Sequence, residues 1–486
     1  MFLSYLLPFP ARGQPALYLW VLYKQIAHFT PQEIAFIGSA AYFRSPEEYQ
    51  RSARRDISTE SQEIYGFRIP AQAELDLYTR YVMPDDVFFD WQALEPTADG
   101  VMRRILSERC PQFESALRRV LDESTCEYEV EAVLTWCNMP SLSAVAAEYG
   151  LPVVHGELGP LRGPCYHWTA YFDRSGVNGN TESAQRYERF LRETDSADVP
   201  VLGTQELRDL LVVTRSVAAP ASGHDFEMGV ALQVENDSNI IAYANGWSNE
   251  RLIAAVASAY GDNNILVRKH PGGLHDYGQV CANVDQSANS IEFIRRCAGI
   301  ATINSSVGLE ALLFDRHSII LGDSPFRFAA QGHLGAAPAN RTSADHLRAL
   351  NFLLFGYLVP YEFVFDPGYL RWRLSEPSEL AIYQFHLDYV RQRRHCIDDG
   401  ARFRPLGLGL TERGLMSFWQ SKTHSMCYRI AALRLQLDEM SERHAVVERT
   451  LGNTLASWSW RLTAPLRWIH RRSQWRTRRR TPRSCP

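Results

Sequence analysis

The stretches ILVRKHPGG (265–273) and IATINSSVGLEALLF (300–314) decide the fold. Each opens with a short run of mostly apolar residues, which favours a buried strand, and then passes into a polar turn. A helical pattern over 291–297 leads into the second stretch, and another over 309–314 closes it. Strands that alternate with helices predict a parallel sheet with crossover helices.

The same alternation extends in both directions along the chain. It predicts a βαβαβ nucleotide-binding lobe in the second half and a similar α/β lobe in the first. In the second half, strands are predicted at 229–234, 265–268, 300–303 and 318–321, with helices at 249–260, 291–297 and 309–314. In the first half, strands are predicted at 34–37, 133–136 and 151–154, with a helix at 141–149.

The remaining segments complete a five-part organisation. The polar segment 180–222 is predicted to be a linker region, and the aromatic-rich segment 343–400 to be helices that pack back on both lobes. The predicted parts are an N-terminal acceptor-side Rossmann-like lobe (1–215), a second Rossmann-like lobe (216–345), a helical region (346–420), a coiled coil (421–451) and a basic tail (452–486).

A heptad pattern predicts the coiled coil. Apolar residues recur at alternating steps of four and three, which is the seam of two or more packed helices. A single amphipathic helix packed on the body is the alternative. The seam runs through Met426, Ile430, Leu433, Leu437, Met440, His444, Val447 and Leu451.

The last 35 residues differ sharply in charge from the rest of the chain. They contain nine Arg and no Asp or Glu, so they carry +9, whereas residues 1–451 carry about −13. Four of the eleven Trp lie between Trp458 and Trp475, among these Arg. Trp favours the headgroup level of a bilayer and Arg is attracted to anionic lipid, so the tail is predicted to associate with a membrane surface. The same residues could contact nucleic acid, but no nucleic-acid-binding fold is predicted in the body.

The composition is that of a globular enzyme. The chain has 486 residues, 45% apolar and 22% charged, with a formal net charge of −4. Its nine Cys are scattered without a CxxC pair, so reduced thiols are expected and neither a disulfide framework nor a zinc site. The N-terminus lacks a basic leader, and no run approaches the ~20 apolar residues of a membrane span. A cytoplasmic location is therefore expected.

Two polar turns form a candidate phosphate site. Lys269 and His270 follow one predicted strand, while Asn304, Ser305 and Ser306 follow the next and open a helix. A helix N-terminus with serine hydroxyls and nearby cations suits the phosphate of a nucleotide sugar. Each motif alone has an ordinary explanation, because an HP pair is commonly a turn and paired serines commonly cap a helix.

Two carboxylates complete the candidate site. Glu157 and Asp237 are each predicted just past a strand, one in each lobe, so both should face the cleft. Glycosyl transfer needs one carboxylate at the anomeric carbon and a proton shuttle for the acceptor hydroxyl. As alternatives, Asp237 is a turn cap and Glu157 is an ordinary loop residue near Arg162. Glu310, one turn into its helix, could accept hydrogen bonds from ribose hydroxyls.

Five strings in this order resemble the retaining β-Kdo glycosyltransferases of bacterial surface-polysaccharide assembly. The closest resemblance is to the Kdo-transferase module of the WbbB type, and the capsule β-Kdo transferases are more distant. The resemblance covers roughly residues 30–400. The strings are HGELGPLRGP (155–164), TAYFDRSGVNG (169–179), LQVENDSN (232–239), RKHPGG (268–273) and TINSSVGLEALLF (302–314).

The resemblance implies a two-lobed GT-B fold, CMP-β-Kdo as donor, and double displacement with retention of configuration. Asp237 matches the family's nucleophile and Glu157 its acid/base residue. His270, Ser305 and Ser306 match the CMP-binding elements. No metal or other cofactor is expected.

Further donor contacts are predicted beside these elements. Arg162 is predicted to bind the Kdo carboxylate, and this prediction rests only on its positive charge. The other predicted donor-binding residues are Gln233, Lys269, Asn304 and Glu310.

The predicted acceptor is a lipid-linked O-antigen or related surface glycan at the inner membrane. The predicted reaction ends the glycan chain. The coiled coil is expected to mediate self-association or to bind other assembly proteins, and no nucleic-acid partner is expected. Two other functions stay open: a GT-B transferase that uses another CMP-sugar such as CMP-sialic acid, and a non-catalytic coiled-coil scaffold.

Overall fold

A computed structural model describes residues 1–7, 16–52, 54–195, 199–213, 223–277, 283–330, 333–335 and 344–398, with Ser441, His444, Glu448 and Arg449. Contacts divide the chain into one unit over Met1–Trp419 and a second over Gln420–Pro486. The predicted heptad seam, apart from His444, and the whole Trp/Arg tail lie outside the described residues.

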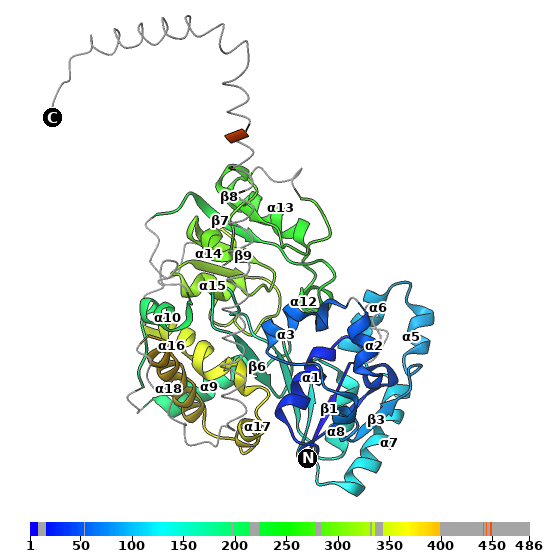
Figure 1. The fold of residues 1–486 in the computed structure, drawn as a ribbon. Helices are drawn as coiled ribbons and strands as arrows, with labels where there is room; N and C mark the ends of the chain where they lie inside the picture. Colours follow the sequence, from blue (N-terminus) through cyan, green and yellow to red (C-terminus); the bar gives the residue numbers. More distant parts are fainter. Residues whose placement is uncertain are drawn as a thin grey trace, which may run out of the picture. The chain divides into compact units, whose positions relative to one another are not determined.

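The N-terminal lobe is built on a seven-stranded sheet with the strand order β11-β6-β5-β4-β1-β2-β3 (Figure 1). Its five strands from β5 to β3 are parallel, whereas β6 runs antiparallel to β5 and β11 antiparallel to β6. The strands are β1 (Phe2–Tyr5), β2 (Ile34–Ser39), β3 (Arg80–Met83), β4 (Ala132–Thr135), β5 (Val153–Leu158), β6 (Thr169–Asp173) and β11 (Val359–Pro360).

Strand β1 lies inside this sheet, although the sequence predicted no strand there. It pairs with β2 and β4, and Phe2 and Leu3 are fully buried. Four residues are too few for a periodic pattern, and the prolines that follow obscure it. The strand forms because both neighbours satisfy its backbone, which is a long-range effect.

Helices cover the sheet of the N-terminal lobe. Two buried clusters of apolar side chains lie between the helices and the strands. The helices are α1 (Leu19–His28), α2 (Pro46–Arg51), α3 (Thr59–Tyr65), α4 (Gln72–Leu75), α5 (Phe89–Leu94), α6 (Ala98–Ser107), α7 (Pro111–Glu127) and α8 (Pro140–Glu148), with 3-10 turns η2 (Ala40–Phe43) and η3 (Arg55–Ile57).

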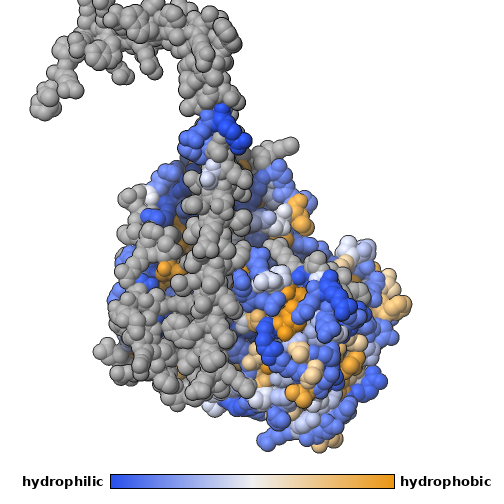
Figure 2. Space-filling model, viewed as in Figure 1, coloured by the Kyte–Doolittle hydropathy of each residue, from blue (hydrophilic) through white to orange (hydrophobic). Residues whose placement is uncertain are grey.

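The sheet ends at β3, and apolar side chains are exposed beside this edge. Val82 of β3 is 56% exposed, and Phe89 and Leu94 of α5 are 64% and 68% exposed. Orange surface marks α5 at the right-hand edge of Figure 2.

The second lobe has the predicted parallel sheet, with the strand order β10-β9-β7-β8. The helix predicted at 249–260 and the strand predicted at 265–268 are confirmed to the residue, and the other elements are displaced by a few residues. The elements are β7 (Phe226–Ala231), α12 (Ser238–Tyr243), α13 (Asn249–Tyr260), η4 (Asp262–Asn264), β8 (Ile265–Arg268), α14 (Ser290–Arg295), β9 (Cys297–Thr302), α15 (Val307–Leu313) and β10 (His317–Ile320). Two α/β lobes of this kind form the expected GT-B architecture.

The predicted linker over 180–222 is wrong for its described residues. They form helices α9 (Ser183–Thr194) and α10 (Thr204–Leu211). Arg186 of α9 is 2% exposed in its side chain and binds Glu379 at 2.9 Å. Arg186 and Arg208 are buried with partners, Glu379 and Asp315, which composition alone does not distinguish from the charges of a solvated loop.

The helical region predicted over 343–400 is confirmed for its described residues. Its aromatic side chains join the large apolar cluster that also contains residues of both lobes. The elements are α16 (Ala344–Asn351), the π-helical turn η5 (Phe352–Tyr357), η6 (Tyr361–Phe363), α17 (Pro367–Leu374) and α18 (Glu379–Asp398).

Candidate active site

A cavity of about 130 Å³ is lined by residues of both lobes. It contains seven of the ten predicted site residues, from four segments far apart in the chain. The N-terminal lobe contributes Leu158, Pro160, Arg162, Tyr171 and Asn178, and the second lobe Gln233, Val234, Asp237, Asn239, His270, Asn304, Ser305, Ser306, Pro325 and Phe326. We refer to this cavity as the interlobe pocket.

Glu157 does not itself line the interlobe pocket, but its chain neighbour Leu158 and its cross-strand partner Tyr171 do. It was predicted to follow its strand, but it lies inside β5, where Tyr171 of β6 pairs with it. The polar sequence HGEL (155–158) adopts a strand conformation because it pairs with β6, which continues the sheet beyond β5. The Glu157 Oε1 atom accepts a hydrogen bond from the Leu158 backbone N–H at 2.7 Å.

The Glu157 carboxyl has an unusual proton affinity. Burial raises its pKa to about 7; the Leu158 N–H and Arg162 oppose the increase, while Asp237 adds to it. A carboxyl group that titrates near neutral pH can accept or release a proton during a reaction. The effect of Asp237 on the pKa of Glu157 also places the two acids in one electrostatic site.

Asp237 occupies the N-cap of α12. Its Oδ1 accepts a hydrogen bond from the Asn239 backbone N–H at 2.9 Å and one from the Ser238 hydroxyl at 3.5 Å. Both bonds use Oδ1, so Oδ2 can meet a ligand in the pocket. The capping role considered for Asp237 therefore coexists with its place in the site, because one oxygen is enough to cap the helix.

His270 lies on the second-lobe side of the interlobe pocket. Its Nδ1 accepts a hydrogen bond from the Gly272 backbone N–H at 3.0 Å, which puts the proton of a neutral ring on Nε2. Burial lowers the pKa of His270, and Arg162 lowers it further, against the effect of Asp237. The ring is thus a neutral hydrogen-bond donor, suited to a phosphate oxygen.

Asn304 and Gln233 tie the strand-end loops of the second lobe together. Gln233 Oε1 accepts from the Asn304 backbone N–H at 3.0 Å, and Asn304 Nδ2 donates to the Asn239 carbonyl at 3.0 Å. Asn304 Oδ1 is buried and has no hydrogen-bond partner in the structure. A buried acceptor without a partner is costly, so a donor group of a ligand would stabilise it.

The remaining predicted residues that line the pocket supply hydroxyls and a cation. Ser305 and Ser306 line the pocket where α15 begins, and Arg162 lines it from the N-terminal lobe. Arg162 donates from Nε to the Gly159 carbonyl at 2.7 Å, which orients its exposed guanidinium group. Together with His270, these groups favour an anionic ligand.

Two predicted donor-binding residues do not line the interlobe pocket. Lys269 pairs with Asp276 instead. Glu310 is buried, and its Oε2 accepts hydrogen bonds from Tyr166 at 3.0 Å and Ser290 at 2.6 Å. Sequence spacing placed Lys269 after a strand and Glu310 one turn into a helix. It could not show the direction in which either side chain points.

Sequence reasoning missed a clamp between the lobes. Asn138, just beyond β4, donates from Nδ2 to the Tyr243 hydroxyl at the end of α12 and to the Val177 carbonyl at 2.9 Å. A Cβ on Gly179 would overlap the Tyr243 ring. Gly179 belongs to the quoted string TAYFDRSGVNG, but nothing in that string points to α12. The clamp holds the helix that carries Asp237.

Two structural features bear on partners. Within the described ranges, no group of three His, Cys, Asp or Glu side chains is arranged to hold a metal ion. Among the helices of the same ranges, none has the length and apolarity to cross a bilayer.

Two family models match the chain. The glycosyltransferase 99 family N-terminal domain matches residues 4–182, and the capsule polysaccharide biosynthesis protein matches residues 224–355. The first match covers most of the N-terminal lobe and the second covers the lobe with the parallel sheet. Together they support a glycosyltransferase of the capsule-polysaccharide type. None of the curated proteins compared with the chain matches it.

Several solved structures are similar at low identity. The β-Kdo 2,7 transferase of Thermosulfurimonas dismutans KpsC is 17% identical over 50% of this chain and 81% of that chain, with a TM-score of 0.36. The β-Kdo 2,4 transferase of the same protein is 15% identical over 48% and 87%, with a TM-score of 0.29. The spinosyn rhamnosyltransferase SpnG is 12% identical over 80% and 96%, with a TM-score of 0.24. These likenesses are too loose to assign a donor, a linkage or a mechanism.

Proposed function

We propose that the chain is a retaining β-Kdo glycosyltransferase that moves Kdo from CMP-β-Kdo to a lipid-linked O-antigen or related surface glycan and ends the glycan chain. One observation carries the proposal. Asp237 lines a pocket whose other polar groups favour an anion, and Glu157, whose pKa is raised by burial and by Asp237, lies beside the lining residues Leu158 and Tyr171. A negatively charged sugar linked through a phosphate suits such a pocket.

The first chemical step uses Asp237. Its Oδ2 attacks the anomeric carbon of Kdo, the new carbon–oxygen bond forms, and the bond from that carbon to the CMP phosphate breaks. The bonding electrons leave with CMP. His270 Nε2–H and the hydroxyls of Ser305 and Ser306 stabilise the departing phosphate, and Arg162 holds the Kdo carboxylate.

The second step uses Glu157 as a general base. The acceptor oxygen attacks the anomeric carbon and the bond to Asp237 breaks, while the acceptor proton passes to the Glu157 carboxylate. Two inversions give net retention of configuration. A base with a pKa near 7 is ionised often enough to act and strong enough to accept the proton. We propose that no metal takes part.

A covalent adduct is the most direct test. Glu157→Gln should slow the second step more than the first, so the Kdo adduct should accumulate on Asp237 when CMP-Kdo is added. Mass spectrometry of the digested protein should find the Kdo mass on the peptide that contains Asp237. Full transfer activity in purified Asp237→Asn protein would overturn the mechanism.

Parallel assays with CMP-Kdo and CMP-sialic acid test the donor. Both donors carry a carboxylate beside the anomeric carbon, so the pocket features above suit either. Transfer from CMP-sialic acid alone would replace the Kdo assignment while leaving the role of the two acids intact.

We also propose that the enzyme acts at the cytoplasmic face of the inner membrane. The Trp/Arg tail (452–486) would hold it there, near its lipid-linked acceptor, and the predicted coiled coil would join copies of the chain or other assembly proteins. Flotation with anionic liposomes should recover the full chain and lose the chain that ends at residue 451. Equal flotation of both would contradict the anchor.

A further inference from the structure

A second cavity, of about 660 Å³, lies in the N-terminal lobe outside the interlobe pocket. It is bounded by α2, η3, α3 and the segment after α3, and it contains none of the predicted site residues. Its lining consists of Tyr49, Gln50, Ser52, Arg54, Ile57, Ser58, Thr59, Gln62, Arg68 and Ile69. We refer to it as the α3 cavity.

The two cations of the α3 cavity are already neutralised. Arg54 binds both oxygens of Asp56, with Nε–Oδ1 at 2.9 Å and Nη2–Oδ2 at 2.8 Å. Arg68 binds Glu74 at 2.6 Å. An anionic ligand would have to compete with these carboxylates, so the α3 cavity favours a neutral ligand, in contrast to the interlobe pocket.

The remaining lining combines polar groups with apolar surface, and a sugar ring likewise combines hydroxyl groups with C–H faces. Gln50, Ser52, Ser58, Thr59 and Gln62 present amide and hydroxyl groups, which can exchange hydrogen bonds with sugar hydroxyls. Several of these groups can still form further hydrogen bonds. Gln62, for example, donates from Nε2 to the Ile57 carbonyl at 3.2 Å, which leaves its Oε1 as an acceptor.

Apolar surface completes this lining. Ile69 is half-buried and lines the cavity, whereas the other two apolar lining residues, Ile57 and Tyr49, are only 4% and 7% exposed, and the Tyr49 ring has Arg54 over it at 5.2 Å. The C–H face of a sugar ring can pack on such surface while its hydroxyls meet the polar groups.

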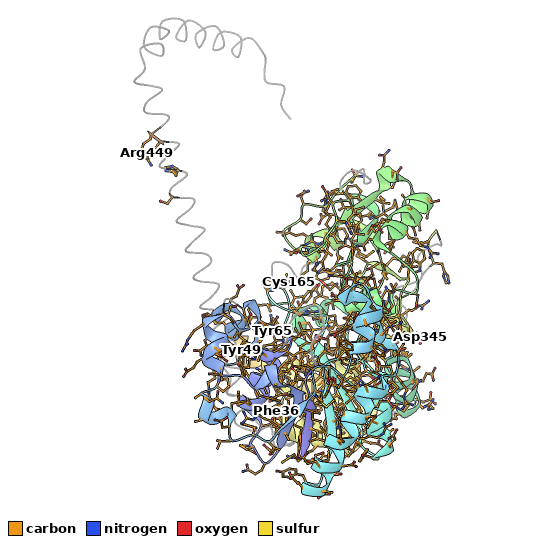
Figure 3. The ribbon with its side chains drawn as sticks, turned by 90° about the vertical axis from the view of Figure 1, so that its right-hand side faces the viewer. Phe36, Tyr49, Tyr65, Cys165, Asp345 and Arg449 are labelled. Atoms are coloured by element: carbon orange, nitrogen blue, oxygen red, sulfur yellow. The ribbon has the colours of Figure 1, made fainter. Side chains whose placement is uncertain are left out.

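An aromatic surface connects α3 with the loop that carries Arg162. Tyr65, at the end of α3, stacks on Trp20 with 4.5 Å between ring centroids and meets Trp168 edge-on at 5.7 Å. Trp168 closes the loop that leaves β5 and includes Arg162, and its indole nitrogen packs against Gly163. Figure 3 labels Tyr65, Tyr49 and Cys165 of this loop in the same part of the view. Tyr65 and Trp168 are both half-buried, so a ligand could reach their exposed edges.

We propose that the α3 cavity binds neutral sugar residues of the acceptor glycan, at a distance from the end of the glycan that reacts. This rests on the proposed function, since it assumes a glycan acceptor at the interlobe pocket. The aromatic surface of Tyr65 and Trp168 would support the sugars in between. Binding at a remote subsite would let the enzyme recognise the repeating part of a polysaccharide as well as its terminus.

The test places a bulky side chain in the α3 cavity of the full-length protein. Thr59 is exposed and lines the cavity, whereas the neighbouring Glu60 is exposed and does not. Thr59→Trp is therefore the blocking variant and Glu60→Trp its matched control. Immobilised neutral and uronate-containing oligosaccharides of equal length serve as probes, and biolayer interferometry measures their binding. Thermal melting checks that both variants are folded.

We expect the wild type and Glu60→Trp to bind neutral oligosaccharides more tightly than acidic ones, and Thr59→Trp to lose about tenfold or more in affinity. Release of CMP from CMP-Kdo without acceptor should be unchanged in Thr59→Trp. Wild-type affinity in Thr59→Trp, a preference for acidic probes, or no binding of any probe by the wild type would each overturn the subsite. Failure of the wild type to release CMP would instead count against the proposed donor, and the oligosaccharide result would stand separately.

Discussion

The two acids of the candidate site lie in contrasting surroundings on either side of the interlobe pocket. On the N-terminal side, Glu157 belongs to a strand that is paired on both edges, and burial raises its pKa to about 7. On the other side, Asp237 caps a short helix after a parallel strand and accepts two hydrogen bonds on one oxygen. Burial favours the protonated form of Glu157, which is why its pKa is raised. The same functional group, a carboxyl, can therefore serve as proton acceptor on one side of the pocket and as nucleophile on the other.

The largest effect is expected at Asp237, where capping and chemistry can be separated. Asn caps helices about as well as Asp, so Asp237→Asn should keep α12 intact while transfer from CMP-Kdo falls by about 10³-fold or more. Asp237→Ala should lose the cap as well, at a cost of about 1 kcal/mol in stability. Steady-state rates and denaturant melts of both variants measure the two effects. If Asp237→Asn melts at lower denaturant than Asp237→Ala, the capping assignment is wrong.

At Glu157 we expect a smaller loss and a changed pH profile. Glu157→Gln should lower kcat by about 10²-fold, since general-base catalysis is removed but the nucleophile stays. In the wild type the rate should rise with pH through about 7 as Glu157 ionises. The rise should be absent in Glu157→Gln. A profile with the same rise in both proteins would show that another group controls it.

The raised pKa of Glu157 also predicts that stability falls with rising pH, whereas activity rises. Because folding raises the pKa of Glu157, the folded state prefers the protonated acid, and ionisation of Glu157 above pH 7 costs stability. Glu157→Gln should therefore raise Tm relative to the wild type at pH 8, and the gain should shrink as the pH approaches 4.5. Thermal melts at pH 8, 6.5 and 5 measure it; a gain that grows toward low pH would contradict the burial argument.

The interlobe clamp should give an intermediate effect. In Gly179→Ala the new methyl group overlaps the Tyr243 ring, so α12 must move, at a cost of about 1–3 kcal/mol in stability. We expect kcat to fall about tenfold with the loss of alignment of Asp237. Gly203→Ala is the control, since its Cβ would have only one neighbour, at 3.7 Å. A double variant with Tyr243→Leu should lose less than the two single changes combined, and strict additivity would disprove the overlap.

The smallest effect is expected at Lys269. Its partner is Asp276, whose side chain is 79% exposed, and Lys269 does not line the interlobe pocket. Lys269→Ala should change the KM for CMP-Kdo by less than about threefold, because exposed ion pairs contribute little. A much larger rise in KM would restore the donor-binding role that the sequence suggested. His270→Ala in the same assay is a useful reference for a residue that lines the pocket.

The sequence alone determined the second lobe and seven of the fifteen residues that line the interlobe pocket. Its strands are mostly apolar runs that end in polar turns, and crossover helices separate them, so local patterns are sufficient. His270, Ser305 and Ser306 could be found because each directly follows such a strand. Their proximity follows from the parallel sheet, which brings the carboxyl ends of its strands to one edge.

Only the tertiary structure decided the rest. The N-terminal strand (2–5) is too short to be recognised until its two neighbours pair with it, and Arg186 looks like a linker residue until Glu379 meets it. Glu157 gains its raised pKa from burial, and α12 its position from Asn138, which is 105 residues away in sequence from Tyr243. These properties arise from long-range contacts, whereas strand and turn patterns are local in sequence.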